Sequence, residues 1–473
     1  MNTKQILAVS LACMLSNCLA CSSVELDPTI TNSDPALIKA IKAENSWLGE
    51  NNVGDTTIKV KPDKDVLPPK PSKKPDLSKI QKGNGNFRLL SVGGGLSAGF
   101  RDGGLYREGQ LTAFPNLVAQ QMGIDFVQPL FSETEGNGTG YKTVSGTEPL
   151  VSYKMVGNNL GVKQGNGETI YTDYAGKGKT DIDQMAFPEI SKELLAFKST
   201  YKKNQSYKYI DRIATNEIKA KYATPSDWVA AQNVDLFIFE LGGDNTLRNI
   251  MSGGGSMSNG PNAGYPTSST SPEFLMMRSL AAKKNKMVLL NVPEIFDFPY
   301  FKQITEARIK KLGVTLLVQT SYGSENYRPF EYSWDYLLPN SPTVEKLFNG
   351  ELRGVVRLQD EDVISQFYSE SEIFEISTKS YNTFEIEREA GWSGMPVVDM
   401  YGLYKRILTR SYTTDDGVAV NPAWPRGGNF FSTDGIYPTA FGQAVIANEV
   451  IKTINKHYGT DISLLQTRFF LNK

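Results

Sequence analysis

The sequence has few of the side chains that most hydrolytic and metal chemistry requires. Its 473 residues include only three cysteines and one histidine. The cysteines, Cys13, Cys18 and Cys21, all lie near the N-terminus, and the histidine is His457. A metal site built from His and Cys side chains therefore has almost no donors to draw on. Any hydrolase mechanism with a histidine base would have to use His457.

An excess of charge of either sign is also missing. The chain has 50 Lys and Arg residues against 51 Asp and Glu residues, for a formal net charge of -1. A nucleic-acid-binding protein normally shows a basic excess or a basic stripe, so this balance excludes that class. Hydrophobic residues make up 40% of the chain and charged residues 21%, which is ordinary for a globular protein and excludes wholesale disorder.

Residues 1–20 are typical of a secretory signal peptide. Lys4 supplies the positive charge, and the apolar run at 6–15 is too short to cross a bilayer. Ala20 directly before Cys21 is typical of a bacterial lipoprotein cleavage site, where the cysteine is acylated, for example with palmitate. Cys18 stands where leucine is usual, so an ordinary secreted protein is the alternative. If Cys21 carries lipid, the mature chain cannot form a disulfide.

Residues 21–86 predict a lipid-anchored tether. Within them, residues 59–86 are rich in proline and lysine and show no hydrophobic period. Prolines favour an extended polyproline conformation and oppose a helix, so this stretch could span on the order of 80 Å. We therefore expect a spacer between the lipid anchor and a folded body that begins at residue 87.

The remaining sequence alternates between strand and helix patterns. Apolar runs at 88–92, 234–241 and 287–292 predict buried parallel strands. Helical spacing is present at 113–122, 274–286 and 439–457. This alternation predicts one α/β domain over 87–473, a flavodoxin-like three-layer α/β/α fold with a parallel sheet. Insertions are expected at about 125–150, 250–272 and 320–390.

Four segments carry a family resemblance. They are VGGGLSAGFRDGGLYREGQLTAFPNLVAQQM at 92–122, NNLGVKQG at 158–165, GGDNTL at 242–247 and FSTDGIYPTAFGQAVIANE at 431–449. In sequence and in order they resemble the motifs of the SGNH (GDSL) hydrolases, in particular the lipoprotein branch of that family. The resemblance covers most of 87–460 and implies an SGNH-hydrolase-like fold.

The resemblance also implies a catalytic site whose reactive residues are replaced. These enzymes use a serine nucleophile, a histidine base and an aspartate that orients the histidine. The nucleophile position is Gly95, which has no side chain, and the histidine position is Tyr437. A phenol with a pKa of about 10 is a poor base at neutral pH. The aspartate position is Asp434, which has no histidine to orient.

The oxyanion hole departs from the family pattern as well. The asparagine position is Asp244, an acceptor where a donor is required. The glycine position falls at Gln164 or at Gly165, depending on one residue of alignment. The resemblance therefore predicts a pseudoenzyme with no catalytic residue and no cofactor at these positions.

Two other arrangements would restore chemistry to this region. A rewired esterase would need Ser97 or His457, but we expect Ser97 to enter the turn after residue 95 and His457 to face solvent. Asp102, Asp244 and Asp434 are candidates for a cation site, although scattered aspartates more often serve as caps and turn residues. We therefore predict no metal site.

The resemblance implies a function as well as a fold. We expect a catalytically inactive lipoprotein of the outer membrane, exposed at the cell surface. Proteins of the lipoprotein branch commonly associate with outer-membrane β-barrels, so the implied role is that of a non-enzymatic subunit in a transport or barrel-assembly complex. The alternatives are an acyl- or glycan-binding module that uses the vestigial cleft, and a weak esterase with a rewired site.

Overall fold

The computed structural model describes residues 55–83, 85–165, 168–188, 205–240, 242–251, 253, 272–320, 325–365 and 378–471. The expected signal peptide and Cys21 lie outside these residues, as does most of the insertion expected at 250–272. Within the described part of the chain, no helix is long and apolar enough to cross a membrane.

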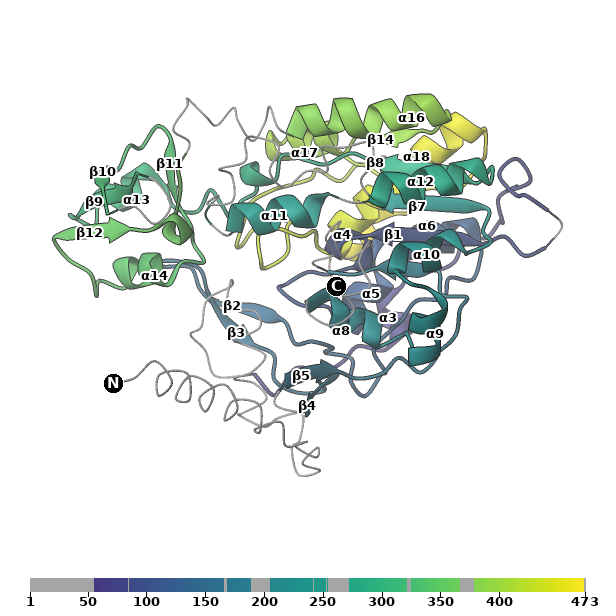
Figure 1. The fold of residues 1–473 in the computed structure, drawn as a ribbon, viewed down its shortest axis with the longest axis horizontal. Helices are drawn as coiled ribbons and strands as arrows, with labels where there is room; N and C mark the ends of the chain where they lie inside the picture. The colour runs from purple at the N-terminus through teal and green to yellow at the C-terminus, as the bar shows by residue number, and fades with distance from the viewer. Residues whose placement is uncertain are drawn as a thin grey trace, which may run out of the picture.

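A five-stranded parallel sheet forms the centre of the molecule (Figure 1). Its strands, in spatial order, are β14 (Val397–Val398), β8 (Lys286–Leu290), β7 (Leu236–Glu240), β1 (Leu89–Gly93) and β6 (Gln184–Ala186). Read from the β6 edge and numbered along the chain, this order is 2-1-3-4-5, one of the two common orders of doubly wound α/β folds. β1 and β7 are buried throughout, which explains their continuous apolar sequences. The expected parallel sheet is confirmed.

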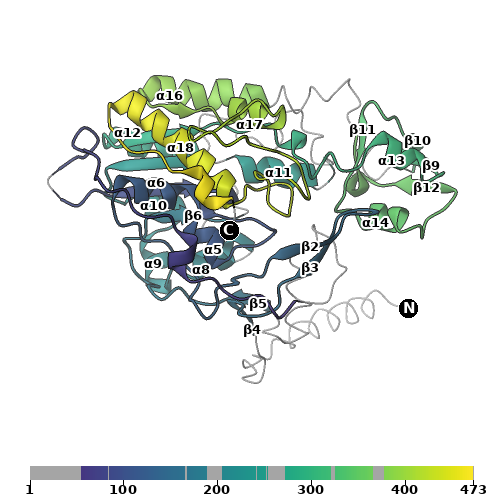
Figure 2. The same ribbon diagram turned by 180° about the vertical axis from the view of Figure 1, so that it is seen from behind.

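Helices flank the sheet on both faces. Helix α6 (Phe114–Met122) packs against the closing helix α18 (Ala440–Tyr458), whereas α10 (Pro225–Ala230), α12 (Pro272–Ala282) and α16 (Arg388–Ser393) pack in series. Because β-α-β crossovers are right-handed, the 2-1-3-4-5 order places these two sets on opposite faces. Figure 2, turned by 180°, brings α18 to the front.

The closing helix shows why the helical predictions hold to within a few residues. The Thr439 hydroxyl accepts a hydrogen bond from Gly442 N at 3.1 Å and so caps the first turn of α18. Gly459 ends the helix in the left-handed conformation, with φ 68°. Between these signals, apolar residues point into the core. Helices expected at 113–122 and 274–286 correspond to α6 and α12.

The N-terminal segment differs from the expected extended spacer. A short helix, α3 (Asp63–Val66), begins directly after Pro62. Val66 is buried, and Ile80 is buried in the main core. Asp63 Oδ2 lies 2.6 Å from Arg107 Nη2, in a partly buried ion pair. The reason is that apolar side chains separated by prolines can still bury individually without a hydrophobic period. The described part of this segment therefore belongs to the folded domain.

A small lobe with its own core stands apart from the main sheet (Figure 1). Its elements are α13 (Glu306–Lys310), β9 (Thr315–Gln319), β10 (Tyr327–Pro329), β11 (Asp335–Leu337), α14 (Pro342–Phe348), β12 (Val355–Leu358) and β13 (Val363–Ser365). The insertion was expected at 320–390. The lobe begins earlier because Ile309 and Leu316 pack into its core, and it ends earlier because residues 378–393 return to the helical layer.

The Gly/Thr-rich insertion expected at 125–150 leads into a hairpin that reaches the lobe. Strands β2 (Lys142–Gly146) and β3 (Ser152–Met155) pair antiparallel. At the tip, Glu148 Oε2 lies 2.6 Å from Arg308 Nη2, and Leu150 packs against the lobe core. The remaining elements are α5 (Arg107–Leu111), β4 (Val162–Gly165), β5 (Glu168–Tyr171), α8 (Gln205–Asp211), α9 (Asn216–Lys221), η5 (Asp360–Asp362), α17 (Met400–Leu408) and η7 (Thr467–Phe470).

Candidate functional site

The candidate site lies at the carboxyl ends of the central strands. In doubly wound sheets, ligands bind outside these ends, where the strand order reverses. Here that point lies beside β1, because its neighbours are β6 on one side and β7 on the other. Three short elements follow the strands at this edge: α4 (Gly95–Ala98) after β1, α11 (Gly243–Met251) after β7 and η4 (Ile295–Asp297) after β8.

The carboxylate of Glu240 fills the glycine-rich turn between β1 and α4. Gly94 N donates a hydrogen bond to Glu240 Oε2 at 3.1 Å. Ser97 donates to the same oxygen from its backbone N at 3.3 Å and from its hydroxyl at 3.0 Å. Ser97 is fully buried in this turn, as expected from the sequence. Its hydroxyl is therefore a structural donor.

Asp244 accepts hydrogen bonds from both degenerate catalytic positions. Gly95 N donates to Asp244 Oδ2 at 2.9 Å, and Tyr437 Oη donates to Asp244 Oδ1 at 2.9 Å. Both Asp244 and Tyr437 are buried. The structure thus brings Gly95, Asp244 and Tyr437 together, although they are distant in the sequence. In this arrangement the Asp244 carboxylate binds the N–H group of Gly95, so that this donor is not offered to a ligand.

The phenol of Tyr437 occupies the space that a side chain at residue 95 would need. A Cβ atom added to Gly95 would lie 2.8 Å from Tyr437 Oη and 3.0 Å from the ring carbons. The ring has little freedom to move, because Phe100 packs against it edge-on at a centroid distance of 5.1 Å and Asp244 holds its hydroxyl. Residue 95 must therefore be glycine while residue 437 is tyrosine.

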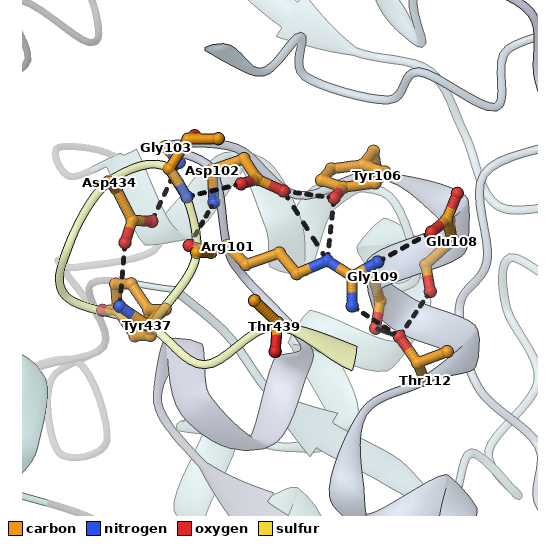
Figure 3. Close-up of polar contacts among 12 residues, drawn as sticks. Arg101, Asp102, Gly103, Tyr106, Glu108, Gly109, Thr112, Asp434, Tyr437 and Thr439 are labelled. Carbon is orange, nitrogen blue, oxygen red and sulfur yellow. Dashed lines mark hydrogen bonds and ion pairs between the residues drawn. The ribbon is translucent and has the colours of Figure 1, made fainter. Parts of the chain in front are cut away.

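Asp434 shapes the loop that carries Tyr437 (Figure 3). Its Oδ1 accepts hydrogen bonds from Ile436 N at 2.8 Å and from Tyr437 N at 2.9 Å. Its Oδ2 accepts from Gly103 N at 3.0 Å, which ties the loop to the segment after α4. All of these partners are backbone N–H groups. Asp434 therefore orients main chain rather than a side-chain base.

A second network holds Asp102 beside this loop. Asp102 Oδ1 accepts from Thr433 N at 2.9 Å, and its Oδ2 accepts from the Tyr106 hydroxyl at 2.5 Å. The buried Arg101 guanidinium donates to Tyr106 Oη at 2.8 Å and pairs with Glu108 at 3.1 Å. Figure 3 shows the chain of contacts from Asp434 to Glu108. The network joins the two loops that border the site.

Burial sets the charge state of the site. Burial and, to a smaller extent, the nearby Asp244 carboxylate raise the pKa of Glu240 to about 8, against the hydrogen bonds from Ser97 and Gly94. Burial, with a contribution from Asp102, raises the pKa of Asp434 to about 6. Burial and Asp244 hold the pKa of Tyr437 well above its usual value. The Tyr437 phenol therefore stays protonated at neutral pH and acts as a donor, not as a base.

A small cavity of about 40 Å³ lies beside these groups. Its lining is largely apolar and includes Leu96, Leu247, Val292, Phe298, Tyr404 and Ile436. The volume is enough for one to a few water-sized groups, because one water needs roughly 10–15 Å³ measured in this way. A long acyl chain would need a pocket of several hundred Å³.

The other candidate residues lie apart from this centre. The Gln164 backbone pairs with Thr169 in the separate β4–β5 hairpin, with Gly165 next to it. His457 is exposed at the end of α18, with a ring nitrogen 3.1 Å from Gly394 O, as expected for a solvent-facing residue. The side chain of Gln164, like Cys21, lies outside what the structure describes.

No cation site is seen among the aspartates. Asp102, Asp244 and Asp434 each accept hydrogen bonds from the protein itself. Among the residues described, no group of three or more His, Cys, Asp and Glu side chains is placed to hold a metal ion.

Sequence reasoning missed Glu240, the residue that fills the turn. Its signal was a second acidic residue, after Asp235, within the otherwise apolar run VDLFIFEL at 234–241. A carboxylate within an otherwise buried strand must find donors, and here those donors are the N–H groups of the neighbouring turn.

Comparisons with known proteins found no match: no family model, no curated protein and no solved structure resembles the chain significantly.

Proposed function

We propose that this chain is a catalytically inactive, SGNH-like outer-membrane lipoprotein that acts as a non-enzymatic subunit of an outer-membrane β-barrel complex. The observation that carries the proposal is the packing of Tyr437 into the space that a nucleophile side chain at residue 95 would occupy. The ordered motifs at 92–122, 158–165, 242–247 and 431–449 supply the family.

The chemistry of the site supports inactivity. A serine hydrolase needs a nucleophile, a base within hydrogen-bond reach and donors for the oxyanion. Gly95 has no side chain. The Tyr437 hydroxyl donates a hydrogen bond to Asp244, and Gly95 N donates a second hydrogen bond to the same carboxylate. Every one of these groups is satisfied by another part of the chain. The site therefore offers a substrate neither attack nor stabilisation.

The architecture suits a subunit that works through its outer surface. The small lobe at 304–365 has a separate core and stands beside the main sheet, where it adds surface without contributing to the candidate site. One fold can host unrelated functions, so a chain without a working hydrolase site can still use such a surface for binding. A lipid on Cys21 would raise the effective concentration of the chain at the membrane, so that a modest interface suffices. The β-barrel partner is what the family resemblance implies.

Co-purification tests the complex. Membranes are solubilised in mild detergent, the full chain is captured through a C-terminal tag, and the co-eluting proteins are identified and quantified. We expect a stoichiometric β-barrel protein. A Cys21→Ser variant should leave the membrane fraction in a high-salt wash and lose that protein. Elution of the unaltered chain without a partner at stoichiometric amounts would contradict the subunit role.

Restoring the lost residues tests the site separately. We expect the purified chain to hydrolyse short-chain esters no faster than buffer does. A triple variant, Gly95→Ser with Tyr437→His and Asp244→Asn, should gain measurable esterase activity if the scaffold is that of an SGNH hydrolase. Gly95→Ser with Asp244→Asn alone is the matched control, because the Tyr437 ring would still block residue 95. Activity of the unaltered chain would contradict the proposal.

The apolar cavity favours one second candidate, the binding of a small acyl or acetyl group. Its volume of about 40 Å³ admits a group of acetyl size and excludes a fatty-acid chain. Calorimetric titration with an N-acetylated sugar tests this function, with Leu96→Phe as a variant that fills the cavity. Binding that Leu96→Phe abolishes would support it, and no heat of binding would remove it.

A further inference from the structure

Large apolar side chains are exposed on one pair of neighbouring helices. Of the six such side chains that the structure describes as exposed, three lie here: Leu275 on α12, Phe384 in the π-helical turn η6 (Asn382–Glu387) and Trp392 on α16. The exposed fraction is 69% for Trp392 and 61% for Phe384. α12 and α16 lie side by side along one side of the molecule (Figure 1).

The helix that carries the two aromatic residues is amphipathic, with one side buried in the core and the other exposed. Helical structure is continuous over 378–393, and the same stretch buries Ile386 and Ala390 in the main core. Phe384 and Trp392 therefore lie on the opposite, outward side. An exposed Phe and Trp cost solubility, and a concentration of such side chains on one surface marks an interaction site.

Two arginines flank the Trp392 ring. The guanidinium carbon of Arg278 lies 5.7 Å from the ring centroid and that of Arg388 lies 5.3 Å from it. Arg278 pairs with Glu389, and Arg388 pairs with Glu385 at 3.0 Å. These pairs fix the arginines beside the ring, so that the indole lies between two guanidinium groups and faces outward.

Exposed lysines continue this face at the amino ends of the strands. The His457 ring contacts Gly394 O, just beyond α16, and Lys286 Nζ lies 5.6 Å from the ring centroid of Tyr458. These contacts bring the ends of α16, α18 and β8 together. We name as the lysine edge the exposed residues Lys283, Lys284, Lys286 and Lys456. Glu387 is the exposed acidic residue on the helix at 378–393.

We propose that the face formed by α12, residues 378–393 and the lysine edge binds a bilayer surface that carries anionic phospholipid headgroups. Exposed Trp and Phe side chains beside a basic edge are the side chains that enter the boundary between headgroups and acyl chains. Lysines within a Debye length of that surface add electrostatic attraction. Protein–protein interface cores, by contrast, are depleted in lysine, which favours the lipid surface as the occupant.

Tryptophan quenching by brominated lipid tests the contact directly. The full chain is mixed with phosphatidylcholine vesicles that contain about one third phosphatidylglycerol and brominated acyl chains. We expect emission quenching that Trp392→Phe reduces at least severalfold. Trp424→Phe is the matched control, because Trp424 lies at the candidate site and donates to Thr433 O. Equal quenching in the unaltered chain and in Trp392→Phe would overturn the proposal.

Charge reversal tests the lysine edge. Lys283→Glu with Lys284→Glu should weaken binding to these vesicles about tenfold or more. The control pair is Lys311→Glu with Lys346→Glu, which makes the same change in net charge on the small lobe and should leave binding unaltered. Equal thermal unfolding midpoints establish that all variants are folded. Equal weakening by both pairs would overturn the proposal, as would a lipid-free dimer that Trp392→Ala dissolves.

Discussion

The two edges of the central sheet use charge in opposite ways. At the carboxyl ends of the strands, Glu240, Asp244 and Asp434 are buried and accept hydrogen bonds from the chain's own N–H and O–H groups. At the amino ends, the charged groups of the lysine edge are exposed. The first edge is complete within the molecule, whereas the second faces outward.

The difference indicates where a partner can bind. A doubly wound fold normally offers the donors at its carboxyl edge to a ligand. In this chain those donors already bind carboxylates of the protein, so a ligand would have to displace a buried, well-packed group. Recognition is therefore expected on outer surfaces such as the helix pair that carries Trp392, where no internal bond must break first.

The largest expected effect concerns the N-terminal segment that leads into β1. Ile80 of the N-terminal segment is 1% exposed, so Ile80→Ala removes buried apolar volume. We expect the free energy of unfolding to fall by about 3 kcal/mol. Lys73→Ala in the same segment is exposed and should change it by less than about 0.5 kcal/mol. Chemical denaturation measures both. Equal, small effects would mean that the segment is a tether and not part of the folded domain.

The next effect tests whether the carboxyl edge is filled. Gly95→Ser places a Cβ atom within 3.0 Å of the buried Tyr437 ring, and we expect the free energy of unfolding to fall by about 2–3 kcal/mol. Adding Tyr437→His should recover part of this loss, which a double-mutant cycle measures. Gly391→Ala, where an added Cβ meets no atom within 4 Å, is the control and should not destabilise. A cycle with no coupling would show that the ring does not fill the space at residue 95.

The next effect is the pH dependence of stability, which is expected from the buried acidic groups at the carboxyl edge. Folding raises the pKa of Glu240 from 4.5 to about 8. Between these values the folded chain binds more protons than the unfolded chain, so the free energy of unfolding falls as pH rises. The slope from one such group is at most about 1.4 kcal/mol per pH unit. Asp434, with a pKa of about 6, adds a similar fall between 3.8 and about 6.

Denaturant unfolding at several pH values between about 5 and 8 measures this slope. Glu240→Gln should flatten the curve above about pH 7, because Gln cannot lose a proton. It should leave the contributions of Asp434 and of Glu294, whose pKa burial raises to about 7, below that pH. An unchanged slope in Glu240→Gln would assign the linkage to another group.

The smallest effect is expected at the lysine edge. Lys284→Gln should change the free energy of unfolding by less than about 0.5 kcal/mol, because the side chain is exposed. High salt should likewise have little effect on the difference in free energy of unfolding between the unaltered chain and Lys284→Gln. A loss above about 1 kcal/mol would show that this lysine stabilises the fold, and that the contrast between the edges is weaker than stated.

Much of the fold could be predicted, because its elements carry local signals. The runs at 234–241 and 287–292 are mostly apolar, as expected for buried parallel strands, and α18 begins at a capping Thr439 and ends at Gly459. The meeting of Gly95 with Tyr437 was predictable only through the ordered motifs, since no local pattern joins residues so far apart.

The rest depends on tertiary contacts that leave little trace in a sequence. Ile80 is a single apolar residue in a proline-rich stretch, and its burial depends on a core that forms elsewhere. Glu240 appeared as an interruption of an apolar run, and its donors belong to a turn about 145 residues earlier in the chain. The start of the lobe at 304 is set by packing within its own core, not by a change of composition.

The hairpin that reaches the lobe has a mechanical consequence. The lobe is held by its own chain ends and also by the tip of β2–β3, through Glu148 and Arg308. The other end of that hairpin is bonded to the site loops, since Lys142 N donates to Asp102 O at 2.8 Å and Thr433 Oγ1 donates to Lys142 O at 2.8 Å. A force applied to the lobe is therefore transmitted along the two paired strands β2 and β3 to the interior of the domain. This second attachment restricts rotation of the lobe about its chain ends, and it connects the lobe to the loops around Asp434.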